Sequence, residues 1–378
     1  MQTEITNLKQ REARSAGQAS FYRPELDILR FFAFLAVYLS HSLRHDPAQL
    51  MKSHITEKAA LLLAAIASSG RFGVQLFFLL SGYLITSLLL REKKVTGHIN
   101  VRAFYVRCIL RIWPLYFFVL TLAALWPWSG RLPLSYFAGF LLLAGNWIVV
   151  LFGVADSWAI ILWSVSIEEQ FYLLWPLGMK FFSRRGWLYT AVGLIVTANL
   201  VRAYLALGLG LSDQVWFNSF AQLDCIGAGV LCAVLLRGSV PRLSIPARLL
   251  MASFGITVLV TCGYYAEVFG PKFAFFGLAC VTGGCLAFFL SVCGSSLSLS
   301  PLVYLGKISY GLYVYHLFAL SLVGRALGTT TGRPLRYAAL WWGGLLLTIA
   351  MASVSYRCLE TPFLRLKERF TCVQSRPV

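Results

Sequence analysis

Apolar runs of about 20 residues recur along almost the whole chain and are separated by short polar loops. A helix of about 20 apolar residues is long enough to cross the hydrocarbon core of a bilayer. Of the 378 residues, 58% are hydrophobic and only 13% are charged, whereas a soluble domain carries about 25% charged residues. The pattern predicts an all-α, polytopic integral membrane protein with about ten transmembrane helices, and it excludes a soluble enzyme.

Two apolar stretches do not fit as simple crossings. The run at 59–69 is too short to span and is expected at the interface. The run at 134–152 cannot cross without violating the charge rule for loops, so we predict that it is re-entrant or interfacial, which requires burial by protein. The ten crossings are expected at about 24–43, 72–90, 110–127, 158–182, 187–209, 216–236, 247–266, 273–293, 302–324 and 337–357.

The formal net charge of +18 comes mostly from basic residues in short loops. The most basic loop, 91–111, holds six Lys/Arg against one Glu, which predicts that this loop and both termini are cytoplasmic. With that orientation, basic residues 325, 333 and 336 would lie outside, which conflicts with the preference of basic residues for the cytoplasmic side. The excess charge therefore indicates topology, or an anionic lipid or ligand, and not nucleic acid.

We expect one membrane domain, 21–365, between a flexible cytoplasmic tail, 1–20, and a second cytoplasmic tail, 366–378. The first apolar run is followed by no small-residue cleavage pattern, so no cleavable signal peptide is predicted. The nine cysteines are scattered and form no Cys-x-x-Cys pair. We therefore expect neither a disulfide nor a metal site.

The first apolar run contains Arg30 and His41. Eleven steps of about 100° bring both side chains to one helix face, roughly 16 Å apart along the axis, with Asp27 one turn from Arg30. Ionisable groups at membrane depth are costly and face protein or water. This stripe predicts a polar path with His41 as a base. The alternative is an arginine that snorkels to the interface and a histidine at the membrane edge.

Further acidic and basic groups interrupt later runs. Glu168 and Glu169 diverge by about 100° on a helix, so at most one of them shares a face with Ser164. A buried carboxylate is costly unless it is paired, so we expect Glu168 to orient a cationic or hydrogen-bonding partner. Asp224 is another intramembrane acid, and Arg202 is a possible partner for it.

A late histidine, His316, is expected in the outer half of its span, at a depth comparable to that of His41. The alternative is a hydrogen-bonded core histidine. The neighbouring tyrosines, Tyr310 and Tyr313, fit packing or sugar stacking better than catalysis. Gly73, Ser81 and Gly82 fit a close approach of two helices.

A basic patch is expected at the cytoplasmic end of the third crossing. Arg107 and Arg111 are spaced i, i+4 and share a helix face. With Lys93, Lys94 and Arg102 nearby, they suit binding of phosphate groups. The alternative is that these residues only set the topology.

Five segments in this order resemble the membrane-bound acyltransferase-3 family over about residues 21–365: Arg30 with His41, then GVQLFFLLSGYLI, FYVRCILRIWPLY, WSVSIEEQFYLLWP and ISYGLYVYHLF. The resemblance implies a bundle of about ten helices in a bacterial cytoplasmic membrane. It also implies acyl transfer, most simply of acetyl, from cytoplasmic acyl-CoA to hydroxyls of extracytoplasmic or lipid-linked carbohydrates such as exopolysaccharide, O-antigen or lipo-oligosaccharide.

By this resemblance, Arg30 and His41 match the essential Arg/His pair, and Arg107 and Arg111 match the motif that faces the acyl donor. Glu168 and His316 match the family's carboxylate and its late histidine. One departure is Cys108, where an arginine often stands. Some members carry a fused esterase-like domain. Nothing after Val378 supplies one, so we expect this chain to complete the transfer alone or with a separate protein.

Two other functions fit the same residues. A proton-coupled transporter would also place His, Glu and Arg in the membrane, although the chain shows no inverted repeat. A non-catalytic subunit of a polysaccharide export assembly is the other alternative. The acceptor, the acyl group and the oligomeric state are left open by the sequence.

Overall fold

A computed structural model describes residues 22–43, 56–126, 132–269, 272–328 and 334–371, together with Met51 and Val373. Every regular element within these ranges is a helix, so the predicted all-α class is confirmed. The expected tail 1–20 lies outside the described residues, as do residue 372 and residues 374–378 of the second tail. The tail and domain boundaries stay predictions.

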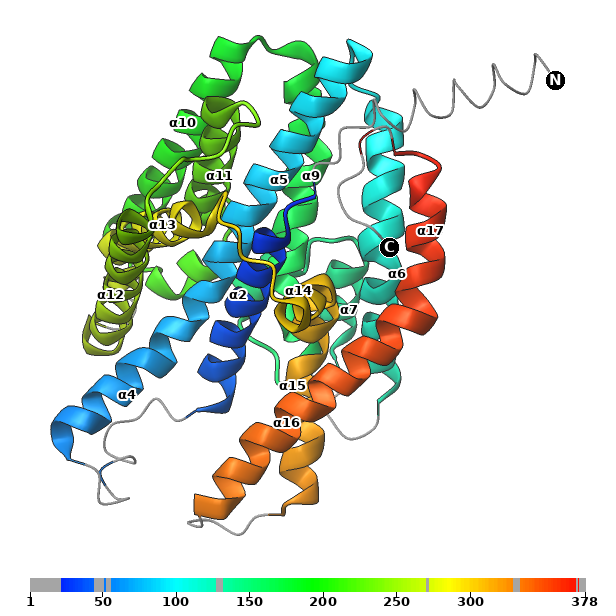
Figure 1. The fold of residues 1–378 in the computed structure, drawn as a ribbon. Coiled ribbons are helices and arrows are strands. Elements are labelled where there is room, and N and C mark those ends of the chain that lie inside the picture. The colour runs from blue at the N-terminus through cyan, green and yellow to red at the C-terminus, as the bar shows by residue number, and fades with distance from the viewer. Residues whose placement is uncertain are drawn as a thin grey trace.

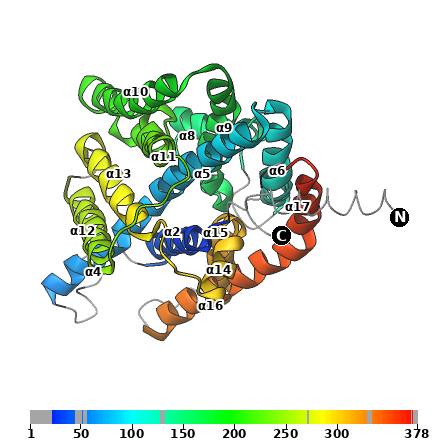
Figure 2. The same cartoon turned by 45° about the horizontal axis from the view of Figure 1, so that its top comes forward.

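Helix α2 (Pro24–Ser42) lies at the centre of the bundle (Figures 1 and 2). It begins with proline at its first turn, where the missing N–H costs no hydrogen bond. Its neighbours are α4, α5, α13, α14, α15 and α16. Because Leu29, Phe34 and Val37 are fully buried, α2 contacts protein and not lipid along most of its length.

The run expected at 59–69 is not a separate interfacial segment. Helix α4 (Glu57–Ser69) continues through a 3-10 turn at Gly70–Phe72 into α5 (Gly73–Thr96), giving one helical stretch of 40 residues. Glycine is required at this turn because a Cβ on Gly70 would lie 2.1 Å from the carbonyl oxygen of Ala36. The turn thus packs directly on the backbone of α2.

The run at 134–152 forms two antiparallel-packed helices, α7 (Leu134–Leu141) and α8 (Gly145–Phe152). Each has eight residues, roughly 12 Å of helix, which is too short to cross the bilayer. Gln170 donates hydrogen bonds to the Leu143 carbonyl and to the fully buried Asn146. Protein therefore contacts part of this turn, while Leu142 is 76% exposed. A re-entrant placement in the membrane, which requires burial of the turn, stays a prediction.

Within the part of the chain that the structure describes, five helical stretches are long and apolar enough to cross a membrane: 57–96, 101–125, 184–208, 245–266 and 336–368. They establish a helical membrane protein, while the predicted number of ten crossings stays a prediction. The remaining helices are α6 (Val101–Leu125), α9 (Trp163–Phe181), α10 (Arg184–Ala203), α11 (Leu223–Leu236), α12 (Ile245–Phe269), α13 (Phe273–Val292), α14 (Ser300–Lys307), α15 (Ser309–Ala326), α16 (Pro334–Ser355) and α17 (Thr361–Glu368).

A buried ion pair joins α10 to α11. Arg202 and Asp224 are 0% and 1% exposed, and a guanidinium nitrogen lies 2.5 Å from a carboxylate oxygen. Thr282 on α13 donates to the other carboxylate oxygen at 2.6 Å. The pairing predicted for Asp224 is confirmed, and it fixes three helices to one another.

Helices α5 and α11 approach closely, because each carries a glycine at the contact. A Cβ on Gly82 would lie 2.3 Å from the Ile226 carbonyl oxygen, and a Cβ on Gly229 would lie 2.1 Å from the Leu79 carbonyl oxygen. The prediction that Gly82 permits close helix approach is confirmed. The same is true of Gly73, where a Cβ would lie 2.3 Å from the Ala33 carbonyl oxygen.

We expect Gly82→Ala to lower the free energy of unfolding by about 1–3 kcal/mol, since the new methyl group meets backbone that cannot move aside. The matched control is Gly193→Ala on α10, where an added Cβ meets nothing within 4 Å and stability should rise slightly. Denaturant titration of the purified protein in detergent measures both. Equal stability of the two variants would contradict the close packing.

Candidate active site

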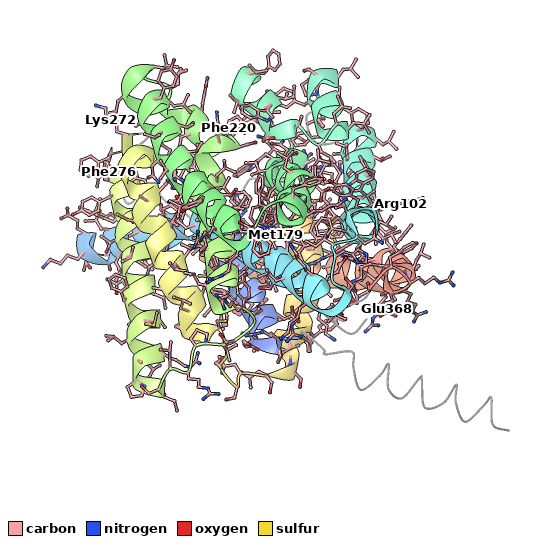
Figure 3. All side chains as sticks on the ribbon, turned by 90° about the horizontal axis from the view of Figure 1, so that it is seen from above. Arg102, Met179, Phe220, Lys272, Phe276 and Glu368 are labelled. Carbon is pink, nitrogen blue, oxygen red and sulfur yellow. The ribbon has the colours of Figure 1, made fainter. Side chains whose placement is uncertain are left out.

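A cavity whose largely apolar lining includes several charged side chains opens where α17 packs against α6 and extends toward α2 and α15. In the view from above (Figure 3), Arg102 on α6 and Glu368 on α17 mark this flank, and Phe276 on α13 marks the opposite one. About 1320 Å³ inside the cavity is unfilled by atoms, counting its mouth. The polar and charged lining residues include Arg30, Ser81, Glu92, Arg107, Arg111, Ser164, Glu168, Tyr172, Tyr310, Tyr313 and Lys367.

The lining carries an excess of positive charge. Four cationic side chains (Arg30, Arg107, Arg111, Lys367) face it, against two carboxylates, Glu92 and Glu168. A low-dielectric cleft lined by one sign of charge raises the local concentration of ligands of the opposite sign. The cavity is therefore suited to an anionic ligand.

The predicted basic patch is only partly assembled around the cavity. Arg107 and Arg111 line it, whereas Lys93 lies 4.8 Å above the Trp187 ring and Lys94 is exposed outside the lining. Lys367 on α17 takes their place. The sequence reasoning missed Lys367 because the residue falls in the expected tail and reaches the cavity only through the packing of α17 on α6 (Figure 1).

Arg107 is held in place at the mouth. Its guanidinium lies 2.6 Å from the Glu92 carboxylate and donates a hydrogen bond of 2.9 Å to the Phe370 carbonyl. Glu92 also accepts from the backbone N–H of Asn100. The end of α5, the start of α6 and the residues after α17 are thereby joined around the mouth.

Glu168 lies inside the cavity and accepts two hydroxyl hydrogen bonds. Ser81 donates to one carboxylate oxygen at 2.9 Å and Tyr172 donates to the other at 3.1 Å. Glu169 faces a different direction, where the Trp113 indole donates to it at 3.0 Å. As predicted, only one of the two glutamates shares the cavity with Ser164, and Glu168 has hydrogen-bonding partners.

Arg30 also lines the cavity, and its guanidinium lies 3.5 Å from the Asp27 carboxylate. The expected neighbour relation between these two residues is thus confirmed. Ser81 had been expected only as a small residue at a helix contact. Ser81 donates to Glu168 because α5 packs against α9. The sequence of either helix alone does not predict that contact.

The two histidines meet outside this lining. Nε2 of His316 lies 3.2 Å from Nδ1 of His41, and the ring centroids are 5.1 Å apart. His316 is fully buried, whereas His41 is exposed at the end of α2. The equal depth predicted for them is consistent with this contact. Arg30 and His41 share α2 but lie in different compartments, one in the cavity and one beyond it.

The hydrogen-bond partners assign the tautomers of the pair. Nδ1 of His316 lies 2.5 Å from the Tyr313 carbonyl, so this nitrogen carries the proton and Nε2 accepts. Nδ1 of His41 faces two acceptors, the Val37 carbonyl at 3.0 Å and His316 Nε2. His41 therefore carries its proton on Nδ1, and its Nε2 holds the basic lone pair.

Tyr310 and Tyr313, expected in packing roles, both line the cavity. The Tyr310 hydroxyl donates to the Ile112 carbonyl at 3.1 Å. Among the residues that the structure describes, no group of three or more His, Cys, Asp or Glu side chains is arranged to hold a metal ion.

A helical membrane protein with a cation-lined cavity and an adjoining histidine pair fits a group-transfer enzyme better than a soluble binding module. The chain belongs to the family described as "Acyltransferase domain" (Acyl_transf_3), which matches residues 23–357. The family resemblance expected from the five segments is confirmed.

Several curated relatives are O-acetyltransferases by name. The chain is 28% identical over 90% of its own length to a Bacillus subtilis protein named "Putative peptidoglycan O-acetyltransferase YrhL". It is 27% identical, also over 90% of its length, to O-acetyltransferase OatA of Staphylococcus aureus. It spans 55% and 57% of the length of these two proteins, a little over half. No solved structure matches the chain.

Proposed function

We propose that the chain transfers an acyl group, most simply acetyl, from cytoplasmic acyl-CoA to a hydroxyl of an extracytoplasmic or lipid-linked carbohydrate. Membership of the acyltransferase family and the names of the relatives support the reaction class. We place the protein in the bacterial cytoplasmic membrane with both termini inside, as the basic loops indicate. Exopolysaccharide, O-antigen and lipo-oligosaccharide stay candidate acceptors, and the name of one relative adds peptidoglycan.

One observation supports this proposal most directly. The cation-lined cavity reaches Tyr313, and the carbonyl of that same residue accepts the hydrogen bond from His316, which contacts His41. Tyr313 therefore belongs both to the lining of the cation-rich cavity and to the hydrogen-bond contacts of the histidine pair. This arrangement suits an anionic donor on one side of the membrane and an alcohol on the other.

The donor half of the site uses the cations of the cavity. Coenzyme A carries several phosphate charges, which Arg107, Arg111 and Lys367 would bind near the mouth. The pantetheine arm would extend along the cavity toward Arg30. His41 lies outside the cavity, roughly 16 Å from Arg30 along α2. The thioester of the donor must therefore pass beyond the cavity to reach His41.

The acceptor half uses His41 as general base. Its Nε2 takes the proton of the acceptor hydroxyl while the oxygen attacks the acyl carbon. The C–S bond then breaks, and the imidazolium returns the proton to the leaving CoA thiolate. We assign the orientation of His41 to His316, which contacts it directly, and we assign Glu168 to the donor cavity, where Ser81 and Tyr172 hold it.

We expect His41→Ala to lower acyl transfer by about 10²–10⁴-fold, the usual contribution of a positioned base. The measurement is transfer of radiolabelled acetyl from acetyl-CoA to a purified surface-glycan fraction by the purified protein. The matched control is His98→Ala, because His98 is exposed on the loop after α5. Full activity of His41→Ala would refute this mechanism.

We expect Arg111→Gln and Lys367→Gln each to raise the KM for acetyl-CoA by about tenfold, because each removes a charge-assisted contact with phosphate. Lys94→Gln should leave KM unchanged, since Lys94 is exposed and outside the cavity lining. If all three variants behave alike, the cavity is not the donor site.

The same preparation separates the alternatives. Acetyl transfer by the chain alone would exclude a purely structural role in polysaccharide export. Uptake of a solute by proteoliposomes without acyl-CoA would favour a transporter instead.

A further inference from the structure

Tyr313 borders both the cavity and the histidine pair. It lines the cavity, and only 6% of its surface is exposed. Its ring centroid lies 5.7 Å from that of His316 and 5.8 Å from that of Phe77, another lining residue. We therefore place this ring on the route that an acyl group would take from the cavity to His41.

A hydroxyl pair holds this ring in position. The Tyr313 hydroxyl shares a hydrogen bond of 2.7 Å with the Ser164 hydroxyl, and both groups also lie 3.3 Å from the Ile161 carbonyl. Ser164 itself lines the cavity from α9. The closed position thus depends on hydrogen bonds between neutral groups, which are weaker than charge-assisted ones.

A barrier is physically necessary at this place. The cavity has an open mouth on one side, and His41 is exposed on the other. A permanent passage between them would let water and ions cross the bilayer, whereas a permanent barrier would keep the thioester from the base. The barrier must therefore open for transfer and close afterwards.

We propose that Tyr313 is the gate between the donor cavity and the histidine pair, and that its hydrogen bond to Ser164 is the latch that keeps the gate closed. This inference rests on the proposed acyl transfer. When the ring turns away, the acyl carbon reaches His41 and the acceptor alcohol attacks it. When the latch is missing and no acceptor is present, water replaces the alcohol.

The hydrolysis is balanced as follows. The oxygen of water forms a bond with the acyl carbon, and the C–S bond breaks. The proton taken up by His41 passes to the CoA thiolate, so the products are a carboxylic acid and free CoA. The rate of this hydrolysis in the absence of acceptor reports how often the gate is open.

Tyr313→Phe and Ser164→Ala each remove the latch but keep the backbone and most of the side-chain volume at Tyr313. We expect each to raise acceptor-independent hydrolysis of acetyl-CoA by about three- to tenfold, the population change that follows from losing one net hydrogen bond. The double variant should hydrolyse no faster than Tyr313→Phe, because that change already removes every hydrogen bond of the Tyr313 hydroxyl, including the one to the Ile161 carbonyl.

The matched control is Tyr136→Phe. Tyr136 is also 6% exposed, and its hydroxyl donates to the Gly153 carbonyl at 2.8 Å, but it lies on α7 outside the cavity lining. Its loss of a hydrogen bond should leave hydrolysis unchanged. Wild-type hydrolysis rates in both latch variants, or an equal increase in Tyr136→Phe, would overturn the proposal.

A second measurement does not depend on catalysis. Vesicles that contain a pH-sensitive dye and the reconstituted Tyr313→Ala variant should leak protons faster than vesicles with wild type or Tyr136→Ala. Leakage without any acyl transfer by the wild type would support the gate and refute the proposed function. Transfer by the wild type with no extra leakage and no extra hydrolysis in the variants would refute the gate alone.

Discussion

The cost of placing ionisable groups at membrane depth determines how this molecule is built. Asp27, Arg30 and His41 all lie on α2, and none of them could face lipid without a penalty of several kcal/mol. Surrounding α2 with other helices removes that penalty, because the charged groups then meet one another, polar side chains or a cavity. The charged groups near the start of α2 are therefore buried within the bundle, and large apolar side chains lie outside, as on α12, where Leu250 is 72% exposed.

The same helix connects the two halves of the proposed reaction. Its start presents Arg30 to a cavity that opens beside α17, and its end presents His41 to the histidine of α15. Since a helix is stiff, the distance between these two groups is fixed by the eleven helical steps from Arg30 to His41. The proposed donor and acceptor sites therefore keep a constant separation, and only side chains between them, such as Tyr313, need to move.

Helix periodicity and the cost of buried charge predicted several features from the sequence. They account for the divergence of Glu168 from Glu169 and for the pairing of Arg202 with Asp224, because both follow from local spacing or from the need for a counter-charge. Lys367 was not predictable in this way, since its position depends on how α17 packs against α6. The family resemblance identified the reaction class but not that Tyr313 borders both the cavity and the histidine pair, which depends on the three-dimensional packing.

The buried polar contacts differ in strength: the Arg202–Asp224 ion pair is strong, and the hydrogen bond between Tyr313 and Ser164 is weak. Breaking one partner of a buried ion pair such as Arg202–Asp224 costs about 3–5 kcal/mol, so α10, α11 and α13 form a part of the bundle that resists rearrangement. A hydrogen bond between two neutral hydroxyls contributes only about 0.5–1.5 kcal/mol, and that is the kind of contact between Tyr313 and Ser164. A contact of this strength breaks often at physiological temperature, whereas the ion pair does not. Rearrangement therefore requires least free energy at Tyr313, where the proposed reaction needs it. It requires most in α10, α11 and α13, which the ion pair holds together.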